Sequence, residues 1–117
     1  MRTITLAGQQ ISVKVAARLE DQIKGLAGQT NLTDSQGMLF TYEDAETQGF
    51  WMKGMKMPID IIWIQGARVV GFEQNVLPDD GAKKYYSPVP VDKVLELAAG
   101  WVRRYKVKIG DEVSFDN

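Results

Sequence analysis

The stretch PIDIIWIQG, residues 58–66, decides the fold class because it has the features of a central β-strand. All six residues after the proline are apolar except Asp60, so both faces of the strand are expected to be buried. The proline stands at the start, where its missing N–H disturbs a sheet least. The closing Gln-Gly pair turns the chain into a second apolar strand over residues 68–75. The first of these two strands is expected in the middle of a sheet.

The rest of the chain adds short strands and little helix. Alternating polar and apolar residues predict a hairpin, and the other strands are short apolar runs between Gly and Pro residues. These further strands are expected at residues 2–6, 10–15, 37–40, 49–53, 91–97 and 112–115, with an extended segment at 85–90. Helical spacing predicts a short helix near 17–27 and one helical turn at 100–105. We therefore expect a mainly-β fold, a jelly-roll-like sandwich or partly open barrel of about eight strands with one or two short helices.

Composition limits the chemistry. The 117 residues contain no Cys and no His, so disulfides, thiolate nucleophiles, thiolate metal sites and a Ser-His-Asp triad are all excluded. Carboxylate, Lys, Tyr and hydroxyl chemistry remain. The length suits one domain over 1–117, and the formal net charge of -1 gives no global reason to expect nucleic acid as a partner. We predict no cofactor and no metal site.

The N-terminal residues do not have the pattern of a signal peptide, and no apolar run is long enough to span a membrane. The sequence as it stands therefore predicts a soluble cytoplasmic protein, a monomer or weak dimer. An extracytoplasmic location is the alternative if a leader has been removed.

Four stretches together resemble a known family. They are GLAG at 25–28, GMLF at 37–40, FWMK at 50–53 continuing through PIDII at 58–62, and SP at 87–88 continuing through VLELAAG at 94–100 to IGDEV at 109–113. In this order and spacing, residues 11–114 resemble the small bacterial and archaeal domain of unknown function family 192. The resemblance implies a compact mainly-β fold of the jelly-roll-like kind and implies no reaction, ligand or catalytic residue. Many relatives look like exported proteins.

This chain departs from the family pattern at three positions. The family often has Arg at the position of Gln29, Asn at the position of Gly54 and Pro at the position of Ala98. If that Arg or Asn serves a common ligand, the function is weakened or lost in this protein.

The candidate ligand-binding residues are Trp51, Lys53, Asp60 and Tyr86. Trp51 and Lys53 lie two apart and share a strand face, where an indole can stack a sugar or base while the ammonium holds an anion. Packing of Trp51 over a sheet edge is the more ordinary interpretation. Asp60 needs a partner within its apolar strand, and a structural role, accepting N–H bonds from the 53–57 loop, is favoured over a general base. Tyr86 lies in an extended segment that could line a groove.

Three function classes follow. The leading hypothesis is a small non-enzymatic binding or accessory module with a shallow site for a polar ligand or partner near 51–60. The alternative is an enzyme acting on a carbohydrate-like substrate, with Asp60, Glu73 or Glu96 as acid/base candidates. The third is an interaction module that uses a sheet edge.

Two further clusters are assigned no function. The Asp-Asp-Gly run at 79–81 lacks the remaining ligands of a calcium loop and is expected to be a solvated turn. Four basic residues between 103 and 108 alternate with aromatic residues, but in an acidic chain a solvated face is the simpler interpretation.

Overall fold

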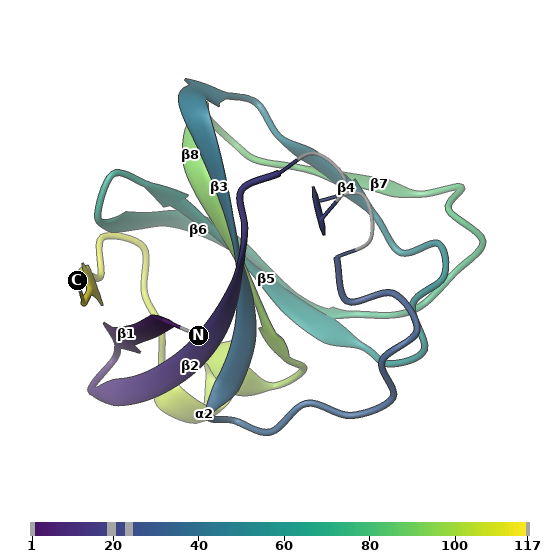
Figure 1. The fold of residues 1–117 in the computed structure, drawn as a ribbon, viewed down its shortest axis with the longest axis horizontal. Coiled ribbons are helices and arrows are strands. Elements are labelled where there is room, and N and C mark those ends of the chain that lie inside the picture. Colours follow the sequence, from purple (N-terminus) through teal and green to yellow (C-terminus); the bar gives the residue numbers. More distant parts are fainter. Residues whose placement is uncertain (1, 19–20, 23–24, 117) are drawn as a thin grey trace.

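The main sheet of the protein has seven strands, as seen in a computed structural model that describes residues 2–18, 21–22 and 25–116. Its strands, in spatial order, are β6 (Arg68–Val76), β5 (Ile59–Gln65), β8 (Val91–Ala98), β3 (Gln36–Glu46), β2 (Gln9–Ala16), β1 (Arg2–Leu6) and β9 (Val113–Phe115). Two short strands, β4 (Gly49–Trp51) and β7 (Lys84–Tyr86), form a separate antiparallel ribbon. The helix α2 (Trp101–Tyr105) follows β8. The fold is thus mainly β, as predicted (Figure 1).

The sheet curls into a half barrel. Every neighbouring pair in it is antiparallel except β2 and β3, which run parallel. The two ends of the sheet approach each other, because Val69 at the start of β6 donates to the carbonyl of Asp111 and accepts from Gly110. An antiparallel bridge between Arg68 and Glu112 continues this contact toward β9. Of the two architectures predicted, the jelly-roll-like sandwich and the partly open barrel, the structure therefore has the partly open barrel.

The hairpin predicted at the N-terminus is present. Strands β1 and β2 are joined by Ala7 and Gly8, whose φ angles are 51° and 76°. Two consecutive positive φ values give a tight turn whose twist suits antiparallel strands. Ile11 and Val13 are buried on one face of β2, as their alternation predicts.

The region between β2 and β5 differs from the prediction in two places. Strand β3 is much longer than the predicted residues 37–40, because it continues as an exposed extension through residues 43–46, which include three acidic residues. The predicted helix near 17–27 lies partly outside the described residues, which omit 19–20 and 23–24. Within the described part, Asp21 and Gln22 are helical, and Gly25 donates to the carbonyl of Asp21 as in an α-helix.

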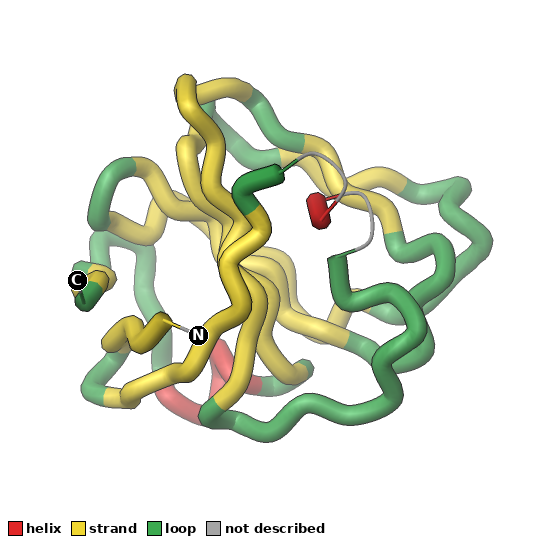
Figure 2. Tube along the Cα trace, in the orientation of Figure 1, coloured by secondary structure: helices red, strands yellow, loops and turns green. Residues whose placement is uncertain are grey.

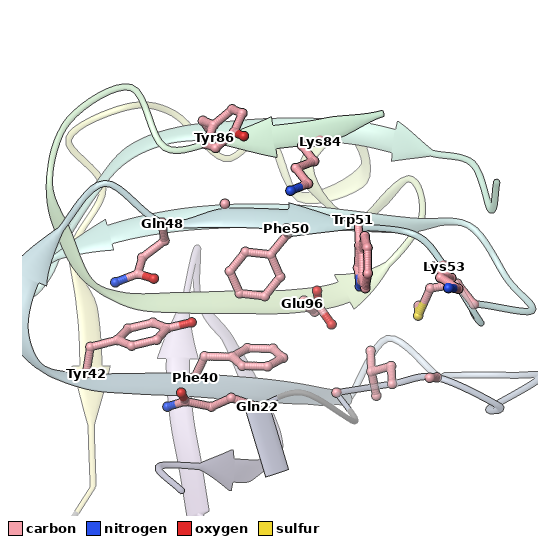
Figure 3. A pocket seen from close by; sticks show the side chains of 15 residues that line it. Gln22, Phe40, Tyr42, Gln48, Phe50, Trp51, Lys53, Lys84, Tyr86 and Glu96 are labelled. Carbon is pink, nitrogen blue, oxygen red and sulfur yellow. The ribbon is translucent and has the colours of Figure 1, made fainter. Parts of the chain in front are cut away.

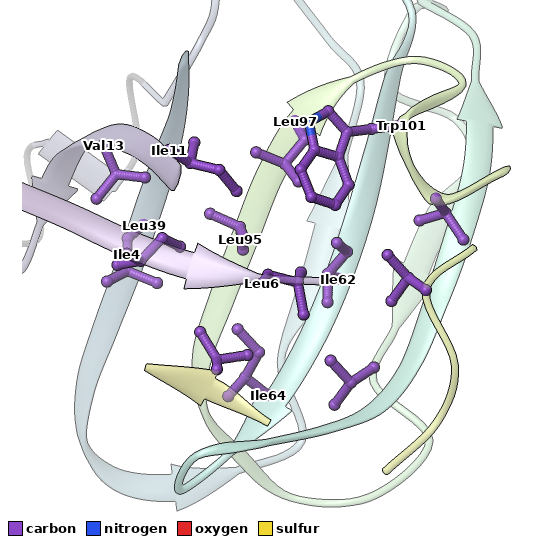
Figure 4. Close-up of a cluster of buried hydrophobic side chains, with 14 residues drawn as sticks. Ile4, Leu6, Ile11, Val13, Leu39, Ile62, Ile64, Leu95, Leu97 and Trp101 are labelled. Atoms are coloured by element: carbon purple, nitrogen blue, oxygen red, sulfur yellow. The ribbon is translucent and has the colours of Figure 1, made fainter. Parts of the chain in front are cut away.

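One cluster of apolar side chains fills the inside of the curled sheet (Figure 4). Ile62 and Ile64 of β5 meet Leu95 and Leu97 of β8 there. The cluster is completed by residues from β1, β2, β3, β6, α2 and the C-terminal segment, namely Ile4, Leu6, Ile11, Val13, Leu39, Val69, Trp101, Val102, Val107 and Val113. The central strands are therefore one wall of the apolar interior of the half barrel.

A second cluster covers the opposite face of the same strands. It contains Ile59, Ile61 and Trp63 of β5, which alternate with the residues of the first cluster. Phe40 of β3 and Met52 after β4 pack beside them. Strand β5 is therefore buried on both faces, as its unbroken apolar run predicts. This second layer lies under the β4–β7 ribbon and the loop before β3, the region where Figure 2 shows mostly loop.

Asp60 connects three parts of the fold. Its carboxylate is fully buried and accepts N–H bonds from Asn75 at 2.8 Å, Gly100 at 3.2 Å and Val102 at 2.8 Å. Asn75 has a positive φ of 52°, and Gly100 is the N-cap of α2, which has no side-chain cap of its own. Asp60 therefore holds a left-handed turn of β6 and caps α2 from a distance. The acceptor role was expected, but the donors differ from the 53–57 loop.

No helix among the described residues has the length and apolar character needed to cross a bilayer.

Candidate functional site

A pocket of about 420 Å³ lies between the main sheet and the β4–β7 ribbon (Figure 3). Strands β3 and β8 supply its floor, the ribbon supplies its roof, and the segment before β3 closes one side. Its lining residues are Gln22, Gly25, Leu26, Ala27, Phe40, Tyr42, Gln48, Gly49, Phe50, Trp51, Lys53, Met55, Lys84, Tyr86 and Glu96. The volume is in the range of small-molecule sites.

Aromatic rings form much of the pocket wall. Phe40 and Phe50 pack edge to face with their ring centroids 4.9 Å apart, and Phe50 packs in the same way on buried Trp63 at 5.9 Å. This ladder fixes the ring of Phe50 between the two sheets. Trp51 and Tyr86 stay 51% and 57% exposed. The wall therefore has a rigid inner part and an accessible aromatic rim.

Two lysines give the rim its charge. The Nζ atoms of Lys53 and Lys84 lie 5.5 Å and 5.8 Å from the centroid of a Trp51 ring, within cation–π distance. Both side chains line the pocket, and within the described part of the chain neither forms an ion pair. The two ammonium groups approach the indole from opposite sides, as Figure 3 shows, and both give positive charge to the rim.

Glu96 is the carboxyl group of the pocket floor. It lies on β8, paired with Met38 on one side and Ile61 on the other, so apolar strands flank it. The residue is only 5% exposed, and its carboxyl makes no hydrogen bond to any described residue. Burial raises the pKa of Glu96 to about 8, so the carboxyl is mostly protonated at neutral pH. Figure 3 shows it between Phe40, Phe50 and Trp51.

The neighbouring polar groups of the pocket differ in their freedom to bind. Burial raises the pKa of Tyr42, and the charge of Glu96 raises it further, so the phenol keeps its proton. The side-chain nitrogen of Gln22 already donates to the carbonyls of Ala16 and Thr41. Tyr42 and Glu96 can therefore offer O–H donors to a ligand, whereas the Gln22 nitrogen is occupied.

The structure brings together three of the four residues predicted as ligand-binding. Trp51, Lys53 and Tyr86 all line the pocket, although they come from β4, the loop after it and β7. Asp60 does not line it and uses its oxygens on backbone N–H groups. Asp60 is close in sequence to Trp51 and precedes Ile61, which pairs with Glu96, but the alternation of β5 turns its side chain to the opposite face of the sheet.

The sequence did not predict that Lys84 and Tyr42 line the pocket, and it gave Glu96 a different role. Glu96 and Glu73 were both candidate acid/base residues of an enzyme. In the structure both pair with Ile61 on opposite sides, so one strand separates them, and Glu73 does not line the pocket. The sequence feature that could have pointed to a special role for Glu96 is its position as a lone carboxylate inside the apolar run VLEL at 94–97. Nothing in the sequence indicated that β7 would place Lys84 beside Trp51.

The other candidate clusters have structural partners. Asp79 and Asp80 accept N–H bonds from Gly81 and Ala82, two residues ahead in each case, which stabilises the expected turn. Trp101, in the basic stretch, is fully buried and donates its indole N–H to the Asp34 carbonyl. It therefore offers no stacking surface to nucleic acid. Over the described residues, no three carboxylates converge as metal ligands.

The family model of DUF192, described as "Uncharacterized ACR", matches residues 2–115. The chain belongs to this family. The resemblance drawn from its motifs is thereby confirmed, over almost the whole chain.

Two solved structures resemble this DUF192 protein closely. A protein of unknown function from Novosphingobium aromaticivorans superimposes with a TM-score of 0.91 at 30% identity, covering 96% of this chain and 83% of that one. A "putative transcription regulator" from Sinorhizobium meliloti 1021 gives 0.87 at 29% identity, covering 97% of this chain and 90% of that one. No curated protein matches the chain. The similarities show the fold and family, and they name no ligand or reaction.

Proposed function

We propose that this DUF192 protein is a binding module for a small molecule, and that its site is the pocket beneath the β4–β7 ribbon. The observation that carries the proposal is the Glu96 carboxyl, buried and without a hydrogen bond among the described residues, yet lining a pocket. The carboxyl is therefore free to hydrogen-bond to a ligand that enters the pocket.

The rim supports the same proposal. Trp51 is a large aromatic side chain kept half exposed, and two unpaired ammonium groups lie at its ring. Burial of such groups by a ligand is favourable because the indole loses water contact and the lysines gain an acceptor. A small pocket with a few convergent polar groups is the usual form of a ligand site.

A thermal-shift screen of polar small molecules, followed by NMR mapping on the 117-residue chain, tests the proposal. We expect bound compounds to perturb the amides of Trp51 and Glu96, and we expect Trp51→Ala and Glu96→Gln to weaken binding. Lys108→Ala, an exposed change outside the pocket, is the matched control. Binding that persists unchanged in both pocket variants would refute the site.

An enzymatic role is the second candidate, and the protonation of Glu96 is what favours it. A carboxyl with a pKa of about 8 can act as a general acid at neutral pH. Glycoside hydrolysis normally needs a second carboxyl group about 5–10 Å away. Among the described lining residues Glu96 is the only acidic one, so the binding role has the better support. Turnover of a polar substrate that is lost in Glu96→Gln and retained in Glu73→Gln would favour the enzyme instead.

A further inference from the structure

We propose that the ligand is nucleotide-like: a planar nitrogen heterocycle that lies against the aromatic wall with a polar edge at Glu96, and that carries an acidic group at the rim, which Lys53 and Lys84 make positive. This inference rests on the proposed function, because it assigns a ligand class to the same pocket. Each of the three parts of the ligand follows from a separate feature of the lining.

The anionic part follows from the charge of the rim. Lys53, in the loop after β4, and Lys84, in β7, both approach one indole ring, and neither has an ion pair in the described structure. Among the described lining residues the only carboxyl is that of Glu96, which lies on the floor. A cationic ligand would therefore meet two like charges around Trp51, whereas a phosphate or carboxylate is attracted by both lysines and gains a charge-assisted hydrogen bond from either one.

The planar part follows from the shape of the wall. Phe40, Phe50 and Trp51 present aromatic surface to the pocket, and the ladder of Phe40, Phe50 and Trp63 holds Phe50 in place. In Figure 3 Trp51 is seen nearly edge-on, with Phe50 and Glu96 on one side and Lys53 on the other. A flat ring placed between these groups can stack on the aromatic surface, and stacking of bases on aromatic side chains tolerates any heterocycle.

The polar edge follows from the state of Glu96. A protonated carboxyl presents an O–H donor and a carbonyl acceptor side by side. A ring edge with an N–H or amino group beside a ring nitrogen or carbonyl has the complementary pair of groups. Tyr42 adds a protonated phenol nearby, and Gln48 adds an amide that makes no side-chain hydrogen bond in the described structure. A hydrocarbon ring would leave all of these groups unpaired, which is costly in a buried site.

The test compares four kinds of probe by calorimetry and NMR on the full chain. They are the four standard nucleoside 5′-monophosphates, the matching nucleosides, inorganic phosphate, and naphthyl phosphate, which has the ring and the anion but no polar edge. We expect at least one monophosphate to bind more tightly than its nucleoside and than naphthyl phosphate, each by about tenfold or more, which is the effect of one charge-assisted or buried hydrogen bond. Inorganic phosphate alone is expected to bind weakly.

Variants assign the two ends of the ligand. The double variant Lys53→Ala/Lys84→Ala removes only exposed charges and is expected to fold. It should reduce monophosphate affinity to that of the nucleoside and leave nucleoside affinity unchanged. Glu96→Gln should bring the affinities of the monophosphate and of naphthyl phosphate closer together, because an amide cannot match the hydrogen-bonding edge of the heterocycle as the carboxyl does. Lys108→Ala should change neither.

The outcomes separate this inference from the proposed function. If no monophosphate binds but other polar compounds perturb Trp51 and Glu96, the nucleotide-like class is wrong and the pocket remains a ligand site. If naphthyl phosphate binds as tightly as every monophosphate, the polar-edge recognition is wrong. If no compound of a broad screen binds at the pocket, both proposals fail.

Discussion

At the scale of single residues, Glu96 makes the stability of the protein depend on pH. The unfolded chain has an ordinary Glu pKa of about 4.3, whereas burial raises the folded value to about 8. Between these values the folded state holds the proton that the unfolded state has lost, so stability falls as pH rises. The slope from this one group is about 1.4 kcal/mol per pH unit at most, and the contribution is constant below and above the window.

We therefore expect Glu96→Gln to gain stability relative to the native protein as pH rises from 5 to 8, since glutamine carries no charge there. Denaturant unfolding at several pH values measures this difference, in which the other titrating groups cancel. Glu73→Gln is the matched control, because Glu73 pairs with the same Ile61 but lies outside the pocket. Parallel pH profiles for the native protein and Glu96→Gln would show that Glu96 is charged throughout.

Asp60 is the second residue with a specific expected effect. Asp60→Asn replaces one acceptor oxygen by an NH₂ donor, which then faces an N–H of Asn75, Gly100 or Val102. We expect a loss of about 2–3 kcal/mol in the free energy of unfolding, the value of a buried hydrogen bond to a charged acceptor. Asp80→Asn, in an exposed turn, should change stability by less than about 0.5 kcal/mol. An unchanged unfolding midpoint for Asp60→Asn would contradict the structural role.

At the scale of elements, two glycines show how differently the main sheet and the ribbon tolerate change. A Cβ on Gly37 in β3 would lie 2.9 Å from the backbone oxygen of Glu96 and 2.6 Å from a methyl of Leu97. A Cβ on Gly49 in β4 would lie 2.7 Å from the ring of Tyr86, a side chain that is 57% exposed. The first contact is with fixed backbone, and the second is with a ring that can rotate away.

Gly37→Ala is therefore expected to destabilise the protein by about 1–3 kcal/mol, as overpacking does in a fixed core. Gly49→Ala should cost less than about 1 kcal/mol and instead displace Tyr86 from the pocket, weakening ligand binding. Thermal unfolding measures the first effect, and the NMR signals of the Tyr86 ring report the second. Equal losses of stability in the two variants would contradict this distinction.

The elements also show what the sequence could predict. The hairpin at β1–β2, the doubly buried β5 and the helical turn of α2 were predicted because local spacing determines them. The extension of β3 through the acidic residues at 43–46 was missed, since charged residues favour turns unless tertiary pairing holds them. The parallel pairing of β2 with β3 joins segments about twenty residues apart along the chain, which no local pattern reports.

The candidate site follows the same rule. Trp51 and Lys53 were predicted together because a two-residue spacing fixes a common strand face. Lys84, Tyr86 and Glu96 reach the same pocket only through the pairing of β7 with β4 and of β8 with β3. Asp60 was assigned to the site on sequence proximity, and its three backbone donors come from residues at least fifteen positions away.

At the scale of the whole molecule, the protein combines a continuous seven-stranded sheet with a separate two-stranded ribbon that forms the roof of the pocket. The main sheet is held by continuous strand pairing and by the contact between β6 and the segment before β9. Strands β4 and β7 have three residues each and pair with each other, outside the seven-stranded sheet. Two short strands alone are marginally stable, so packing on the second apolar cluster must hold the ribbon in place.

This arrangement predicts the order in which parts of the molecule open. Amide hydrogens of β4 and β7 should exchange through local opening at a lower free energy than those of β5 and β8, which exchange only on global unfolding. A ligand bound under the ribbon should slow hydrogen exchange in β4 and β7, because the ligand binds only while the ribbon is in place over the pocket. The ratio of the exchange rates of β5 and β8 should stay unchanged. Hydrogen-exchange mass spectrometry with and without a bound compound measures both effects. If the amides of β4 and β7 exchange as slowly as those of β5, the ribbon and the main sheet unfold as one unit and the predicted order of opening is wrong. A ligand would then have to enter at the rim beside Trp51, with the ribbon still in place.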